Sequence, residues 1–154
     1  IFFHRPPPPH PSPRSRPDLL PCYTASALVY LEMHLLENTD GFDPATFERD
    51  TLAKIDMPAE IVMRHRTPHF AHVFSGDGYS AGYYSYMWSE VMDADAFEAF
   101  TEAGDPFDAE TAERLAVSIY AAGGSQAPEA AYKAFRGRLP TVDALLKQRG
   151  LEGV

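Results

Sequence analysis

The sequence is poor in cysteine, in basic residues and in long apolar runs, and each shortage excludes a class of protein. Cys22 is the single cysteine among 154 residues, which excludes an intrachain disulfide framework and a zinc site built on several thiolates. Lys and Arg number 13 against 22 Asp and Glu, for a net charge of −9, which argues against a nucleic-acid or anionic-membrane surface. The apolar runs are only a few residues long and cannot span a bilayer. We therefore expect no nucleic-acid partner and no membrane partner.

Proline is concentrated at the N-terminus. Residues 1–21 contain eight of the 14 prolines and three arginines against one aspartate. The proline run 6–9 favours polyproline II and cannot join a helix or a central strand. We expect residues 1–22 to be a disordered Pro-rich or foreign segment, with a ligand for a proline-binding domain as the alternative. Residues 23–154 then form the folded part.

From Thr24 onward the apolar spacing is helical, and no stretch shows sustained alternation with a period of two. Asp43-Pro44, Met57-Pro58 and Asp108 are typical helix starts, because a carboxylate caps the first N–H groups and proline suits the first turn. Gly123-Gly124 and Gly150 are typical helix ends. The pattern predicts an all-α fold. The first expected helix covers 24–37, with Thr24 as its cap and Leu28, Leu31 and Leu35 at helical spacing. The other expected helices cover a stretch from 44, a stretch from 58, 79–100, 109–122, 128–136 and 141–149, and a loop is expected over 66–78.

Three histidines, His65, His69 and His72, recur at spacings of four and three. Such spacing can bring three imidazoles to one metal ion. Pro68 interrupts the helix that would align them, and no glutamate stands where an HExxH site needs it. We therefore favour histidines that contact a substrate or face solvent.

A run of tyrosines occupies residues 79–86. On a helix, Tyr79, Tyr83 and Tyr86 stand at i, i+4 and i+7 and share one face. A phenol stays neutral at pH 7 and donates a hydrogen bond, so these hydroxyls suit the stabilisation of an oxyanion. Gly76 and Gly78 precede the run and allow a ligand to approach the backbone. The alternative is a stripe of aromatic side chains that only packs in a core.

Two further groups of charged residues have both a chemical and a structural interpretation. Two carboxylates of the acidic run can act as an acid–base pair, or the run can form a solvated face. The two arginines around Gly137 can bind a carboxylate, or they can form ion pairs and cap a helix. The residues concerned are Asp93, Asp95, Glu98, Glu102, Asp105, Arg136 and Arg138.

The segment 72–88, HVFSGDGYSAGYYSYMW, resembles the substrate-binding signature of the thimet oligopeptidase family of zinc metallopeptidases. The flanking stretches agree with this: RHRTPHFAH before it, then DADAFEAF, AGGS and AFRGRLPTVDALLKQRGL. The sequence is most similar to the branch of bacterial peptidyl-dipeptidases and oligopeptidase A. The resemblance covers residues 24–151.

The resemblance implies a role for each residue of the signature. His72 and Tyr79 would bind the substrate, and Gly76 and Gly78 would lie in a loop that closes over it. Tyr83 and Tyr86 would bind the substrate and stabilise the oxyanion, which makes them the catalytic candidates. The implied fold is the C-terminal helical part of a zincin-type oligopeptidase catalytic domain. The implied activity is the zinc-dependent hydrolysis of short peptides in the cytoplasm, by an endopeptidase or a peptidyl-dipeptidase.

The family binds zinc through an HExxH helix and a later glutamate, and this sequence contains no HExxH motif and no glutamate that matches the metal ligand. We therefore predict no metal ligand in this chain and no peptidase activity for the chain alone. Its expected partners are short peptides and the missing N-terminal part of the peptidase. Residues 1–22 do not resemble the family, which suggests a frame-shifted or misassembled N-terminus. The alternative function is a non-catalytic helical module that binds peptides or a partner.

Overall fold

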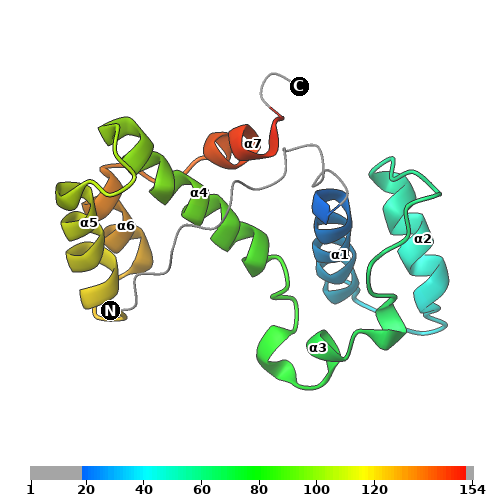
Figure 1. The fold of residues 1–154 in the computed structure, drawn as a ribbon. Coiled ribbons are helices and arrows are strands. Elements are labelled where there is room, and N and C mark those ends of the chain that lie inside the picture. Colours follow the sequence, from blue (N-terminus) through cyan, green and yellow to red (C-terminus); the bar gives the residue numbers. More distant parts are fainter. Residues whose placement is uncertain (1–18, 152–154) are drawn as a thin grey trace. The chain divides into compact units, whose positions relative to one another are not determined.

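The structure, a computed structural model, describes residues 19–151, with side chains from Tyr23 onward. The chain divides into two compact units, unit 1 (Ile1–Ser85) and unit 2 (Tyr86–Val154), whose helices are labelled in Figure 1. Every regular element between residues 19 and 151 is helical, which confirms the predicted all-α class. The Pro-rich segment predicted over residues 1–22 lies almost wholly outside the described residues, and its boundary stays a prediction.

Unit 1 pairs two helices and carries a chain of short helical turns after them. Helices α1 (Leu19–His34) and α2 (Pro44–Lys54) lie side by side in Figure 1 and pack on each other. The turns are η2 (Thr67–His69), α3 (Ala71–Phe74) and η3 (Asp77–Tyr79). The sequence predicted a loop over 66–78, and these single turns occupy most of it.

Helix α1 starts five residues before the predicted cap at Thr24. Pro21 lies in its first turn, where the missing N–H has no intrahelical partner to lose. Of the leucines at helical spacing, Leu31 is 36% exposed, and Leu35, which follows the end of the helix, is 66% exposed. The buried residues of the helix include Ala25, Ser26, Val29 and Tyr30.

Helix α2 begins as predicted, and the helix predicted after Met57-Pro58 does not form. The Asp43 carboxylate accepts a hydrogen bond of 2.9 Å from the Thr46 N–H, and Pro44 occupies the first position. Beyond α2, Asp56 has a φ of 52°, a left-handed conformation that ends a right-handed helix. A single turn then closes through Ile61 N–H and the Pro58 carbonyl, 3.0 Å apart.

Unit 2 contains most of the long helix α4 (Ser85–Ala103), then α5 (Ala109–Leu115), the π-helical segment η4 (Ala116–Ala121), α6 (Pro128–Arg136) and α7 (Asp143–Arg149). The Asp108 carboxylate caps α5 by accepting a 2.8 Å hydrogen bond from Thr111 N–H. Gly123, Gly137 and Gly150 have positive φ, as expected at helix C-termini. These boundaries confirm the predicted cap at Asp108 and the predicted ends near Gly123 and at Gly150.

Helix α7 is fixed on α4 by a small apolar cluster and two ion pairs. The cluster contains Val91, Ala94, Ala144 and Leu145. Around it, Lys147 pairs with Glu98 and Arg149 with Glu90, each at 2.9 Å. Between residues 19 and 151, no helix has both the length and the apolarity that a membrane span requires.

Candidate functional site

The tyrosine run is not one helical face, so that prediction is wrong. Helix α4 begins only at Ser85, and residues 80–84 form turns. Ala81 has a φ of 53°, which a right-handed helix excludes. Tyr79 therefore ends η3, Tyr83 lies in the turn, and Tyr86 is in the first turn of α4.

Instead, unit 1 gathers its aromatic rings into one cluster. Tyr83 stacks on Tyr23 at 5.3 Å between ring centroids and meets Phe70 edge-on at 5.0 Å. Phe70 in turn contacts Tyr30 at 5.0 Å. We define the aromatic cluster as Tyr23, Tyr30, His65, Phe70, His72, Phe74, Tyr79 and Tyr83. Its members come from α1, from residues 65–79, which include the turns η2 to η3, and from the following loop, so the cluster joins segments distant in sequence.

His72 and Tyr79 form the exposed edge of this cluster. Their ring centroids are 4.3 Å apart, and the Tyr83 ring lies 6.4 Å from His72. His72 is exposed and Tyr79 is 41% exposed, whereas Tyr83 is only 6% exposed. An imidazole and a phenol are thus presented to solvent on a buried aromatic base, and both can donate hydrogen bonds to a polar ligand.

The structure brings three of the four predicted aromatic site residues together. His72, Tyr79 and Tyr83 are in contact within unit 1, while Tyr86 is the first residue of unit 2 and is half-buried. Burial of Tyr83 gives its ring a packing role, which the alternative interpretation of the tyrosine run had proposed for all of its rings. The catalytic roles of Tyr83 and Tyr86 stay predictions.

Gly76 and Gly78 lie in the connection between α3 and η3, and nothing crowds them. A methyl group at either position would meet no atom within 4 Å. Gly76 has a φ of 171°, which is extended backbone open to any residue. The folded chain therefore does not itself require glycine at these two positions, and their predicted role in substrate binding stays a prediction.

The three histidines at metal-like spacing do not share a site. His65 stacks on Phe70 at 4.5 Å with the rings almost parallel, and His69 is an exposed residue of η2. Within residues 19–151, no three His, Cys, Asp or Glu side chains are arranged to hold a metal ion.

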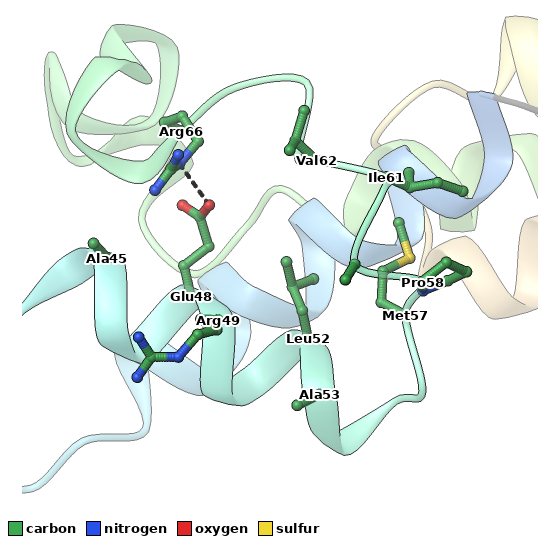
Figure 2. Close-up of a pocket in the computed structure, with 11 residues that line it drawn as sticks. Ala45, Glu48, Arg49, Leu52, Ala53, Met57, Pro58, Ile61, Val62 and Arg66 are labelled. Carbon is green, nitrogen blue, oxygen red and sulfur yellow. Dashed lines mark ion pairs between the residues drawn. The ribbon is translucent and has the colours of Figure 1, made fainter.

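Glu48 is a buried residue that the sequence analysis missed. It is 5% exposed on α2, and its Oε2 accepts hydrogen bonds from the N–H and the hydroxyl of Thr67, both 3.2 Å. Its Oε1 pairs with Arg66 Nε at 2.7 Å. The dashed ion pair in Figure 2 shows the carboxylate pointing to Arg66. We call Glu48, Arg66 and Thr67 the Glu48 clamp; only proximity in the fold reveals it, because Glu48 and Thr67 are 19 residues apart.

A cavity of about 490 Å³ lies beside this clamp. Figure 2 shows Leu52, Met57, Ile61 and Val62 around it, with Glu48 and Arg66 at the opposite side. None of the predicted site residues lines it. The cavity is thus separate from the His72–Tyr79 edge, although Glu48 and Arg66 border it.

In unit 2 the arginines and acids noted in the sequence bind each other. Asp95 is 1% exposed, and its carboxylate pairs with Arg138 at 2.6 Å and Arg136 at 3.3 Å. Arg136 also binds both oxygens of Glu102, at 2.7 and 2.8 Å. The Tyr132 hydroxyl donates to Asp95 Oδ2 at 2.8 Å. These five residues, the Asp95 network, join α4 to α6 and its C-terminal connection, which is the structural interpretation of both charged groups.

Comparison with known proteins gives the same family for almost all of the described chain. The model of peptidase family M3 matches residues 23–151. The chain is 44% identical to oligopeptidase A of Escherichia coli over 108 residues, which cover 68% of this chain and 16% of the relative. It is 38% identical to dipeptidyl carboxypeptidase of Salmonella typhimurium over 130 residues, 82% of this chain and 19% of the relative.

A plant relative agrees. The chain is 51% identical to the probable cytosolic oligopeptidase A of Arabidopsis thaliana over 85 residues, 53% of this chain and 12% of the relative. The aligned part thus amounts to less than a fifth of each of these three relatives. The resemblance to the thimet oligopeptidase family is confirmed, and this all-α chain belongs to peptidase family M3.

Proposed function

We propose that this chain is the peptide-binding side of a zinc-dependent oligopeptidase or peptidyl-dipeptidase that cleaves short peptides. The observation that carries the proposal is the His72–Tyr79 pair, with ring centroids 4.3 Å apart at the exposed edge of the aromatic cluster. The names of the relatives, oligopeptidase A and dipeptidyl carboxypeptidase, support a peptide as the ligand. The proposed location is the cytosol, which the name of the plant relative supports.

The proposed roles follow from the donors at this edge. A peptide backbone offers carbonyl acceptors, and the Tyr79 hydroxyl and a ring N–H of His72 can donate to them. The buried rings of the aromatic cluster limit the rotamers of His72 and Tyr79, so peptide binding costs less side-chain entropy. Gly76 and Gly78 leave open space beside the pair, where a peptide backbone can approach. Tyr83 and Tyr86 are proposed as the donors that stabilise the developing oxyanion.

The described residues do not fit a zinc ion, because no group of three ligating side chains is present among them. We therefore propose that the metal belongs to a part of the parent peptidase outside this chain, and we assign no catalytic step to it here. The chain alone is expected not to hydrolyse peptides. A peptidase rate of the purified chain that a chelator abolishes contradicts this part of the proposal.

Exposed apolar side chains support a larger parent protein. Phe107 is 87% exposed, Tyr120 74%, Leu35 and Val62 66%, and Val117 63%. Large apolar surfaces that face solvent are typical of interfaces. A purified chain that associates through exposed apolar side chains supports the fragment interpretation, and a stable cooperative monomer supports the alternative of an independent peptide-binding module.

The direct test is a calorimetric titration of the chain with a short unstructured peptide. We expect saturable binding that His72→Ala and Tyr79→Ala each weaken about tenfold or more, equivalent to about 1.4 kcal/mol. Tyr120→Ala is the matched control, since it removes a more exposed tyrosine from unit 2. Absence of binding, or an equal loss in the control, contradicts the proposed function.

A further inference from the structure

We propose that Glu48 is a positioning residue, which holds His72 in place for peptide binding through the Glu48 clamp. This inference deepens the proposed function and rests on it. It concerns a side chain on α2, 24 positions before His72 in the sequence, that contacts neither His72 nor Tyr79 in any ring pair or hydrogen bond described above.

The first step is the burial of a charge at the start of the segment that carries His72. Glu48 and Thr67 are 5% and 4% exposed, so the carboxylate has little water and depends on Arg66 and the two Thr67 donors. A buried carboxylate with several short contacts resists displacement, because any movement leaves a charge or a donor unsatisfied. Thr67 is the first residue of η2, and the clamp therefore anchors this turn to α2.

The second step is the short connection from the anchor to His72. Phe70, three residues after Thr67, is 5% exposed and lies between Tyr30 and Tyr83, with ring centroids 5.0 Å away in both cases. Helix α3 begins at the next residue, and its second residue is His72. With Thr67 and Phe70 both fixed, the backbone of α3 has little freedom, and the His72 ring is held at the exposed edge beside Tyr79.

The third step explains why this anchor is needed. Helix α3 has four residues and no side-chain cap, and η2 has three residues and no side-chain cap. Turns of this length are marginal in isolation, because nucleation costs more than so few hydrogen bonds return. Their geometry must come from tertiary contacts, and the Glu48 clamp supplies the polar contact at their start.

The test uses the ring-proton NMR signals of the full chain without any peptide. The Tyr79 ring, 4.3 Å from His72, displaces the His72 signals from their unfolded positions, and substitution of His72 assigns them. We expect Glu48→Ala to remove most of this displacement, and Glu48→Gln and Thr67→Val to remove part of it. Thr67→Ser keeps the hydroxyl and is therefore expected to leave the displacement of the His72 signals as in the wild type. The His34 signals serve as the internal control, because His34 is fixed on α1 by a 2.7 Å contact with the Tyr30 carbonyl.

Two matched variants separate positioning from general destabilisation. Asp50→Ala removes an exposed carboxylate from the same helix, and Asp95→Asn replaces the buried carboxylate of unit 2 by a neutral amide. Both variants are expected to leave the His72 signals unchanged. If Glu48→Ala does not fold, Glu48→Gln and Thr67→Val decide the question. Unchanged His72 signals in these two folded variants overturn the proposal.

A peptide titration of the wild-type chain distinguishes this inference from the proposed function. Movement of the His72 signals on addition of a short peptide supports peptide binding. Without such movement the proposed function fails, whereas the effect of Glu48 on the peptide-free signals still measures the positioning. If both hold, Glu48→Gln is expected to weaken peptide binding several-fold, and Thr67→Ser is expected to bind like the wild type.

Discussion

Among the residues that the structure describes, each unit has one buried carboxylate that binds an arginine, but the two carboxylates organise different kinds of structure. In unit 2, Asp95 joins the regular helix α4 to α6 through Tyr132 and Arg136. In unit 1, Glu48 joins α2 to an irregular run of short turns. A buried charge can thus either connect helices that form by their own sequence pattern or hold turns that have no such pattern. The unit with the irregular chain also presents the candidate site.

Asp95→Ala removes the carboxylate that we expect to contribute more to the stability of the fold, and it has the largest expected effect. Arg136 has a side chain only 7% exposed, and loss of a buried partner costs about 3 to 5 kcal/mol. The unfolding transition in urea, followed by fluorescence of Trp88, the one tryptophan of the chain and a residue of unit 2, is expected to shift to lower urea. Asp93→Ala, at an exposed position of the same helix, is the control, and an equal shift in both variants contradicts the prediction.

Glu48→Ala is expected to cost less, about 2 kcal/mol, because the main loss is the unsatisfied buried Thr67 donors. Its cation partner, Arg66, is 51% exposed and regains water. The change in stability is measured by urea unfolding followed through the tyrosine circular dichroism of the aromatic cluster. A loss as large as that of Asp95→Ala would mean that the two carboxylates are equivalent, against the comparison.

Tyr132→Phe tests the Asp95 network of unit 2 through the pH dependence of its stability. Burial, followed by the hydrogen bond and the charge of Asp95, raises the pKa of Tyr132 above its ordinary value near 10. The folded state therefore favours the neutral phenol, and this contribution to stability is complete below pH 10 and is lost as the pH rises further. At neutral pH we expect a loss of about 1.5 kcal/mol for the missing hydrogen bond to a charged acceptor.

Above pH 10 the difference between wild type and Tyr132→Phe is expected to narrow, because the variant has no phenol at this position to ionise. Burial also raises the pKa of Tyr30 in unit 1, and that contribution is common to both proteins. Urea unfolding at a series of pH values measures the difference. A constant difference from neutral to alkaline pH would refute the assigned role of the Tyr132 proton.

Ala81→Gly has the smallest effect and the opposite sign. Ala81 has a φ of 53°, which costs an L-residue about 1 to 2 kcal/mol, while glycine adds about 0.5 to 1 kcal/mol of chain entropy. We expect a net stabilisation of up to about 1 kcal/mol, seen as a higher melting temperature. Gly82→Ala is the control, because its added methyl group lies 3.6 Å from the Tyr79 carbonyl oxygen, an ordinary contact distance. A destabilised Ala81→Gly variant would mean that another interaction fixes this turn.

How far sequence reasoning reached differs between the same two units. In unit 2 the cap at Asp108, the start at Pro128 and the end at Arg136 are as predicted, because local spacing and capping chemistry decide them. In unit 1 the left-handed residues Asp56 and Ala81 broke a predicted helix and the predicted tyrosine face. The spacing of polar and apolar side chains does not predict a left-handed backbone conformation in residues other than glycine.

The sequence alone predicts the helical class, the caps at Asp43 and Asp108 and the signature that gives family membership, because these depend on residue type at short spacing. Only the tertiary structure shows that the Tyr83 ring is buried and that His72 and Tyr79 form the exposed edge of the aromatic cluster. It also shows that Glu48 anchors the turns that carry His72 and Tyr79. Those features depend on contacts between segments distant in sequence, where burial leaves a charge or a ring with only a few possible partners. The periodicity of one segment cannot specify such a partner in another.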